Sequence, residues 1–146
     1  MKRFVPDVNT LLALLDPMHV HHEAAHRWYA GQSPLRLILC SHVENGVIRV
    51  ASQPKYPNCL GTASRVRDVL RKFVQKVNTA SCGQDVSLLG DEVLLQADML
   101  TPSRVSDLYL LALAAANDAR FATFDTRIPA AAVAGGPAAL ETIPVS

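Results

Sequence analysis

A chain of 146 residues is long enough for one domain, which we expect to span residues 1–146. Apolar residues make up 49% and charged residues 18%, which excludes a disordered chain and a coiled coil. The formal net charge of +1 excludes a protein that binds nucleic acid through its overall positive charge. Any contact with a polyanion must therefore come from a local patch.

The cysteines and the N-terminal segment indicate the compartment. Cys40, Cys59 and Cys82 are odd in number, widely spaced and free of any Cys-x-x-Cys pair, so they predict neither a disulfide framework nor a cysteine zinc site. Pro6 and Asp7 interrupt the apolar N-terminal stretch, and no apolar run approaches the roughly 20 residues of a membrane span. We expect a cytoplasmic protein with no export signal and no membrane contact.

The apolar pattern predicts strands that alternate with helices. In chain order we expect a strand at 3–5, helices at 9–15 and 20–31, a strand at 35–40, a helix capped by Ser41 with strand as the alternative, and a long helix from Thr62 or Ser64 to Lys76. There follow a turn at 81–84, a short strand at 86–89, a helix at 91–99, a buried helix capped by Ser106, a strand at 120–124, a small-residue loop at 130–136 and a final strand near 142–143. This alternation is typical of an α/β fold with a largely parallel sheet covered on both faces.

Four acidic residues occupy suggestive positions in this scheme. Asp7 and Asp125 are each the first carboxylate after an apolar strand, and sites in parallel sheets form at the carboxyl ends of strands. Asp107 lies in the first turn of the buried helix, and Glu44 lies in an otherwise apolar helix. Singly, such residues are more often turn, cap or helix-dipole partners. Together they are the hard oxygen ligands with which Mg²⁺ or Mn²⁺ supports phosphodiester cleavage.

Four segments carry a resemblance to a known family: Val5–Leu12, Val43–Val50, Ser106–Ala114 and Phe121–Asp125. In this order and at these spacings they resemble the PIN-domain nucleases, and specifically the VapC-type toxins of bacterial toxin–antitoxin modules. The resemblance spans nearly the whole chain. It implies a PIN-like α/β/α sandwich, dependence on Mg²⁺ or Mn²⁺, endonuclease activity on RNA, a homodimer, and neutralisation by a small cognate antitoxin.

The resemblance also implies roles for individual residues. Four positions match the family's catalytic and metal-binding acidic quartet: Asp7, Glu44, Asp107 and Asp125. Asn9 and Thr123 match polar neighbours that orient the quartet. The pair Asn117 and Asp118 stands where the family often has a glycine, a mild departure because both residue types tolerate the left-handed conformation.

A second metal motif competes with this interpretation. The segment HEAAH, from His22 to His26, has the zincin pattern in which two histidines one turn apart bind zinc. If Val20 and Trp28 belong to the buried face of this helix, both histidines point onto the surface. A zinc hydrolase, with Glu44 as a third ligand, is therefore the less favoured alternative.

Basic residues supply candidate RNA contacts. The long helix is basic through Arg65, Arg67, Arg71, Lys72 and Lys76, a pattern that fits either a solvated face or a surface for RNA or an acidic antitoxin segment. Arg49 and Arg127 are closer to the carboxylate motifs. The candidate RNA contacts are Arg49, Arg127, Arg65 and Lys72. A PIN-fold module that binds RNA or protein without cleaving anything is the other alternative.

Overall fold

A computed structural model describes all residues from 1 to 146. Its strands are β1 (Lys2–Pro6), β2 (Leu35–Leu39), β3 (Thr79–Ser81), β4 (Arg120–Thr123) and β5 (Leu140–Thr142). They form one five-stranded sheet in the order β3-β2-β1-β4-β5, and every neighbouring pair is parallel. Phe4 at the centre pairs with Leu37 on one side and Arg120 on the other. The predicted α/β class with a parallel sheet is confirmed.

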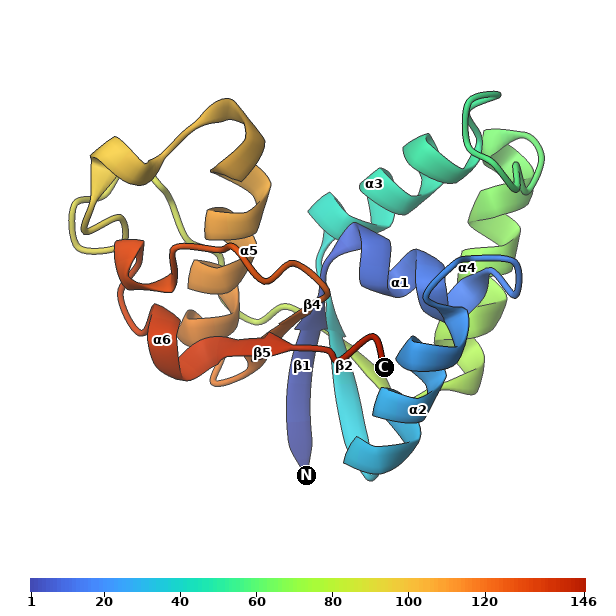
Figure 1. The fold of residues 1–146 in the computed structure, drawn as a ribbon, viewed down its shortest axis with the longest axis horizontal. Coiled ribbons are helices and arrows are strands. Elements are labelled where there is room, and N and C mark those ends of the chain that lie inside the picture. Colours follow the sequence, from blue (N-terminus) through green and yellow to red (C-terminus); the bar gives the residue numbers. More distant parts are fainter.

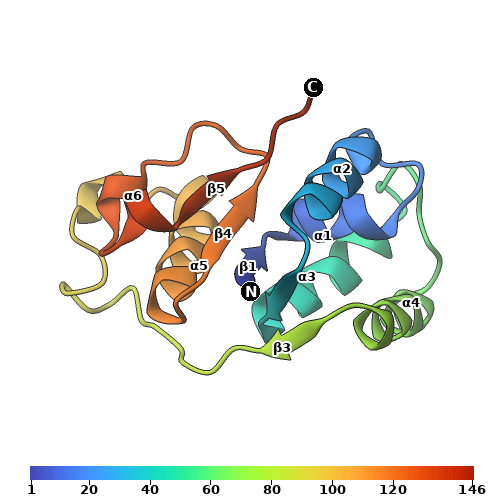
Figure 2. The same ribbon diagram turned by 90° about the horizontal axis from the view of Figure 1, so that it is seen from below.

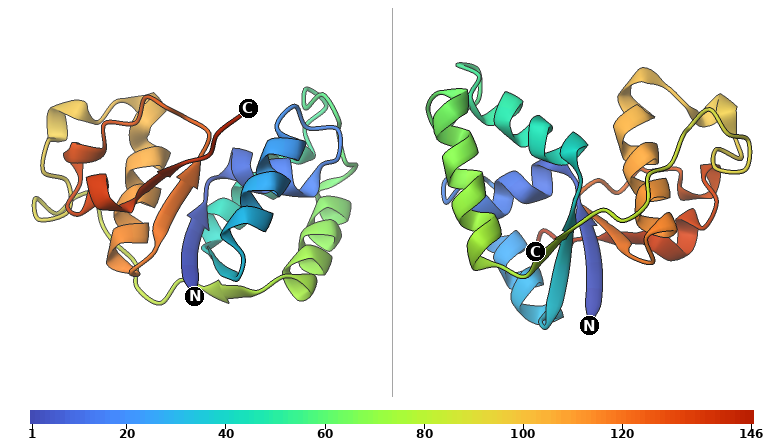
Figure 3. Two further views of the ribbon diagram at one scale, coloured as in Figure 1. Left: turned by 60° about the horizontal axis from the view of Figure 1, so that its bottom comes forward. Right: turned by 180° about the vertical axis from the view of Figure 1, so that it is seen from behind.

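Helices cover both faces of this sheet. The helices are α1 (Val8–Leu15), α2 (His22–Gln32), α3 (Ser41–Ala51), α4 (Ala63–Lys76), α5 (Val105–Ala116) and α6 (Gly136–Ala139), with 3-10 turns η1 (Ala97–Met99), η2 (Pro102–Arg104) and η3 (Ala130–Ala132). Figure 1 and both views in Figure 3 show α1 to α4 on one side of β1, and α5 and α6 on the other. Right-handed crossovers explain this division, because the chain steps from β1 to β2 and β3 in one direction, and β4 then lies on the other side of β1 (Figure 2).

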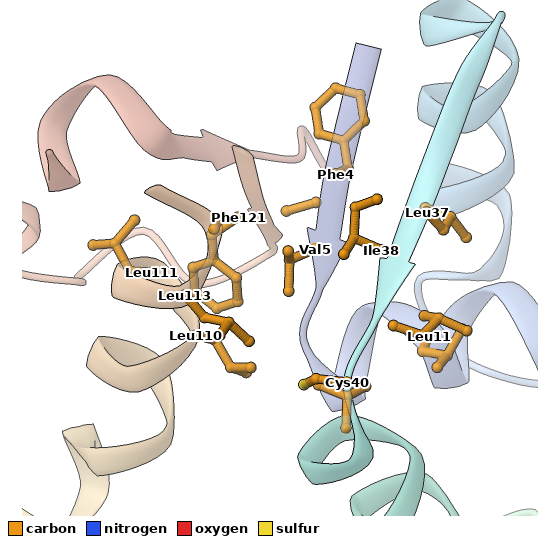
Figure 4. Packing of buried hydrophobic residues seen from close by; sticks show 14 of the residues in the cluster. Phe4, Val5, Leu11, Leu37, Ile38, Cys40, Leu110, Leu111, Leu113 and Phe121 are labelled. Atoms are coloured by element: carbon orange, nitrogen blue, oxygen red, sulfur yellow. The ribbon is translucent and has the colours of Figure 1, made fainter. Parts of the chain in front are cut away.

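The central strands are mostly apolar because both of their faces are buried, and their charged residues lie near their first residues: Lys2, Arg3, Arg36 and Arg120. Phe4 and Val5 of β1 are at most 1% exposed, and the Phe4 ring packs edge-on against Trp28 of α2 with 4.9 Å between ring centroids. Figure 4 shows Phe121 of β4 lying against the buried leucines of α5. The predicted burial of α5 is confirmed. None of the helices combines the length and the apolar character that crossing a membrane requires.

The HEAAH segment agrees with the prediction only in part. Val20 lies outside α2 and is 86% exposed, so Val20 does not belong to the buried face. His22 Nδ1 lies 2.7 Å from the carbonyl oxygen of Ala13, and His26 Nε2 lies 2.9 Å from that of Leu14. These carbonyls are in the last turn of α1, where a helix leaves its carbonyl groups without internal partners. Both histidines therefore cap α1, and only His22 is partly buried, because His26 remains exposed as predicted.

We expect His22→Ala and His26→Ala each to lower the melting temperature, because each leaves a carbonyl of α1 without its side-chain donor. A loss of about 1 kcal/mol per hydrogen bond corresponds to about 3 °C in a domain of this size. Calorimetry in EDTA measures the change, with Arg27→Ala on the exposed face of α2 as the control. If instead the wild-type melting temperature itself fell when zinc was removed, His22 and His26 would belong to a zinc site.

Asp16 holds the end of α1 to the loop that follows α3. Its side chain is almost fully buried, at 1% exposure. Oδ2 accepts hydrogen bonds from the Tyr56 hydroxyl (2.6 Å) and from Asn58 Nδ2 (3.1 Å), and Oδ1 accepts one from the Met18 amide (2.9 Å). Burial alone would raise the pKa of Asp16, but these hydrogen bonds outweigh it and leave the pKa below its ordinary value. This carboxylate is structural and lies outside the quartet.

The segment between β3 and α5 was predicted wrongly. The strand in this region is Thr79–Ser81, not 86–89, and residues 91–99 form turns and η1 instead of a helix. Their backbone groups bond across the molecule: Leu95 N donates to Ala132 O at 2.7 Å, and Ala134 N donates to Val93 O at 3.0 Å. The expected loop at 130–136 accordingly contains η3 and the first residue of α6.

Candidate active site

Three of the predicted carboxylates meet at one edge of the sheet. Asp7 follows β1 directly, Asp125 lies two residues after β4, and Asp107 is in the first turn of α5. Parallel strands end at the same edge, and α5 runs back across the sheet, so its N-terminus lies beside those ends. Asp7 caps α1, so two of these carboxylates also lie at helix N-termini, where negative charge is favoured.

Asp7 is held by two threonines. Its Oδ1 accepts a hydrogen bond from the Thr10 amide, and its Oδ2 accepts one from the Thr123 hydroxyl, both at 2.7 Å. The same Thr123 oxygen accepts a hydrogen bond from the Asp125 amide at 3.1 Å, so one hydroxyl links the two acidic segments. Burial raises the pKa of Asp7, the hydrogen bonds from Thr10 and Thr123 oppose that rise, and the charge of Asp125 adds to it.

Asp107 and Asp125 both form an ion pair with Arg104. Arg104 Nη1 lies 3.7 Å from Asp107 Oδ2 and 3.5 Å from Asp125 Oδ2. Burial raises the pKa of Asp107, the charges of Asp7 and Asp125 raise it further, and Arg104 opposes them. The negative charges of the three aspartates therefore interact with one another. Exposed Arg127 makes a further ion pair with Asp125 Oδ1 at 3.6 Å.

Glu44 lies apart from the three aspartates. It is half-buried in the first turn of α3, and its side chain makes no hydrogen bond or ion pair. It lines a groove of about 340 Å³ between α3 and α4 together with Arg67 and Arg71. It also lines a hollow of about 260 Å³ that contains Cys40 and Tyr109. The structure thus brings three members of the quartet together, whereas Glu44 lines two neighbouring hollows that contain none of the three aspartates.

Of the residues predicted to orient the quartet or to cap α3 and α5, only Thr123 lies where it was expected. Thr123 contacts Asp7 as described, but Asn9 is exposed and its Oδ1 lies 2.9 Å from His19 Nε2 instead of near a carboxylate. Neither predicted serine caps its helix: Cys40 precedes α3, and Arg104 precedes α5. The Ser106 hydroxyl instead lies 3.2 Å from His42 Nε2.

Two functional candidates have no counterpart in the sequence-based prediction. Thr10 is fully buried, and its hydroxyl donates to Ala122 O at 3.2 Å while its amide holds Asp7. Its place inside the first acidic motif could have indicated this role. Arg104 carried no comparable signal, because an arginine before a helix is usually solvated.

Of the four basic residues predicted to contact RNA, only Arg127 makes an ion pair with one of the acidic residues. Arg127 is beside Asp125 and is 82% exposed. Arg49, Arg65 and Lys72 are exposed and make no ion pair with the acidic residues. On α4 it is Arg67 and Arg71, not Arg65 and Lys72, that line the groove with Glu44.

The donor atoms at this edge suit a hard cation. In this conformation no three His, Cys, Asp or Glu side chains close around one point, and His22 and His26 have no third ligand beside them. Among the aspartates, however, a guanidinium already lies between Asp107 and Asp125, which shows that a positive charge is accommodated there. Carboxylate oxygens without histidine or thiolate are the ligands that Mg²⁺ and Mn²⁺ prefer.

Comparison with known proteins shows to which family the chain belongs. The family model described as PIN domain matches residues 4–134, and the chain belongs to the PIN-domain family. It is 41% identical over 133 residues to Ribonuclease VapC44 of Mycobacterium tuberculosis, covering 91% of this chain and 93% of that protein. Ribonuclease VapC38 of the same organism is 33% identical over 123 residues, which cover 84% of each chain.

The fold also matches a solved structure. The crystal structure of VapBC2 from Rickettsia felis, bound to a DNA fragment from their promoter, superposes with a TM-score of 0.63 over 97% of this chain and 99% of that one. The sequence identity is 13%, so this likeness shows the fold alone.

Proposed function

We propose that this chain is a metal-dependent endoribonuclease and the toxin of a bacterial toxin–antitoxin pair. The observation that carries the proposal is the convergence of Asp7, Asp107 and Asp125 from separate elements at the carboxyl edge of a parallel sheet. The curated relatives of highest identity reported above are named ribonucleases, which supports RNA as the substrate.

The three aspartates would hold Mg²⁺ or Mn²⁺, and Glu44 would complete the ligand set. Such an ion, when bound, activates a water molecule and stabilises the leaving oxygen. The chain's own contribution is to orient the ligands. Thr10 and Thr123 hold the two oxygens of Asp7, and Thr123 also fixes the backbone of Asp125, so the Asp7 carboxylate is held in one orientation.

Basic residues beside the site would position the RNA backbone. Arg127 lies next to Asp125, and Arg67 and Arg71 line the groove that contains Glu44, so positive charge is present near both groups of acidic residues. This local charge meets the requirement that a chain of net charge +1 bind a polyanion through a patch. A cognate antitoxin and a homodimer belong to the same proposal, and the likeness to a VapBC fold supports the antitoxin.

Cleavage of structured RNA by the purified protein tests the proposal. We expect cleavage with Mn²⁺, none in excess EDTA, and recovery when Mn²⁺ is restored. Asp107→Asn and Asp125→Asn should each slow cleavage at least about 100-fold, since each removes a ligand charge worth several kcal/mol. The matched control is Asp91→Asn, because Asp91 is an exposed aspartate in a turn and its side chain makes no ion pair.

Two results would contradict the proposal. RNA binding without cleavage in the wild-type protein would favour the non-catalytic module. Cleavage that survives both site substitutions at the rate of the Asp91→Asn control would assign the activity to another part of the chain or to a contaminant.

A further inference from the structure

We propose that Arg104 is a built-in counter-cation that competes with the divalent ion for Asp107 and Asp125. The inference rests on the metal site of the proposed function, and it concerns a residue outside the acidic quartet. It makes Arg104 a positioning residue, which holds the carboxylates while no ion is bound and must leave when one binds.

The position of the guanidinium is the first argument. One atom, Nη1, lies 3.5 to 3.7 Å from an oxygen of each aspartate, so a single positive charge bridges the two carboxylates. The Arg104 side chain is only 21% exposed. Both separations are longer than the roughly 2.7–2.9 Å of a strong charge-assisted hydrogen bond. The guanidinium therefore neutralises the pair without being locked to either member.

Local structure offers no other reason for a cation at this position. Arg104 ends η2 and is the residue directly before α5. The N-terminus of a helix carries partial positive charge, which repels an arginine side chain. The backbone is fixed independently of the side chain, since the Arg104 amide donates to Thr101 O at 2.8 Å. Attraction to the two aspartates is the contact that accounts for the guanidinium's position.

Competition follows from the charges. A divalent ion on Asp107 and Asp125 would lie within a few ångströms of the guanidinium, and like charges at about 4 Å repel appreciably even in water. The ion and the guanidinium cannot both occupy the space between these oxygens. Removing the guanidinium charge should therefore tighten metal binding, whereas removing a solvent-exposed charge beside the same carboxylate should change it little.

The test measures Mn²⁺ binding without RNA, by calorimetry and by the electron paramagnetic resonance signal of free Mn²⁺. We expect Arg104→Gln to bind Mn²⁺ at least about tenfold more tightly than wild type. Arg127→Gln is the matched control, because Arg127 carries the same charge and also pairs with Asp125. The Arg127 side chain is 82% exposed, so the Mn²⁺ affinity of this variant should differ from that of wild type by less than about threefold. Arg104→Lys, which keeps the charge, should remain close to wild type.

A second measurement separates competition from a general effect of charge. In EDTA we expect Arg104→Gln to melt at a lower temperature than Arg127→Gln, because its aspartates lose their partly buried counter-charge. Equal Mn²⁺ affinity in Arg104→Gln and Arg127→Gln, or weaker binding in Arg104→Gln than in wild type, would overturn the inference and leave the proposed cleavage intact. Absence of Mn²⁺ binding in every variant would overturn the inference together with the proposed metal site.

Discussion

Asp7→Asn is expected to lower RNA cleavage at least about 100-fold while leaving the metal-free protein as stable as wild type or about 1 kcal/mol more stable. Activity falls because the substitution removes a ligand charge. Stability is kept because an amide oxygen can still accept from the Thr10 amide and cap α1. The raised pKa of Asp7 means that the folded protein disfavours the charged form, and the neutral amide removes this cost.

The pH dependence gives the sign of this effect. The folded-state pKa of Asp7 lies above its unfolded-state pKa. Ionisation of Asp7 therefore lowers the stability of the folded protein as the pH rises from the unfolded-state pKa to the folded-state pKa. The gain of Asp7→Asn should therefore be present at neutral pH, where about 1 kcal/mol corresponds to about 3 °C, and should vanish below the ordinary pKa of an aspartate. Calorimetry in EDTA at both pH values measures it.

Asp7→Ala is the matched control for the structural part of this argument. It is equally uncharged, but it loses the cap of α1 and leaves the Thr123 hydroxyl without a side-chain partner, whereas the amide group of Asn can still donate to that hydroxyl. We expect it to melt about 3–6 °C below Asp7→Asn, from about 1–2 kcal/mol. Added Mn²⁺ should raise the wild-type midpoint more than that of either variant. An Asp7→Asn protein that still cut RNA and melted several degrees below wild type in EDTA would make Asp7 a structural cap.

Asp16→Asn is expected to lower the melting temperature by about 6–9 °C without changing the cleavage rate at a temperature where the protein is folded. An amide in this buried position cannot accept all three hydrogen bonds, because its nitrogen faces a donor. One unsatisfied buried group and a weakened network cost about 2–3 kcal/mol. Asp91→Asn, in an exposed turn, is the control and should melt like wild type.

The contribution of Asp16 should also depend on pH. Its folded-state pKa is lowered, so the stability it contributes is present above its unfolded pKa and is lost as the pH falls through the folded pKa. The difference between wild type and Asp16→Asn should therefore shrink in acid. Tyr56→Phe, which removes one donor, should cost about 1 kcal/mol, and less in the Asp16→Asn background. Additive effects would show that the two groups do not interact.

The sequence predicted those parts of the fold that have a strong local pattern. The apolar runs at 3–5, 35–40 and 120–124 are central strands, and the amphipathic segment from Thr62 to Lys76 is α4 with Thr62 as its cap. Because Asp7 and Asp125 directly follow such runs, their convergence could be anticipated from strand direction alone. The same reasoning could not predict where Glu44 lies relative to the aspartates, because Glu44 is on a helix and strand direction does not fix the position of a helical side chain.

The errors lie where contacts distant in sequence decide the local structure. The edge strand Thr79–Ser81 has only three residues and no apolar alternation. Residues 91–99 look helical in isolation, but their amides find partners near Ala132. Arg104 and Asp16 were missed for the same reason, because an ion pair with Asp125 and a hydrogen bond from Tyr56 leave no local pattern. Tertiary contacts of this kind override propensity.

The order of strands in the sheet has a consequence for protein synthesis. Asp7 is among the first residues made, but β1 acquires its neighbour β4 only through pairs such as Phe4 with Arg120. Asp107 and Asp125 belong to that same late segment. A nascent chain on the ribosome therefore carries Asp7 long before the other two aspartates of the site, and non-local strand pairing is itself slow. Cleavage of RNA must await the emergence and docking of β4, so strand order separates the start of synthesis from the onset of activity.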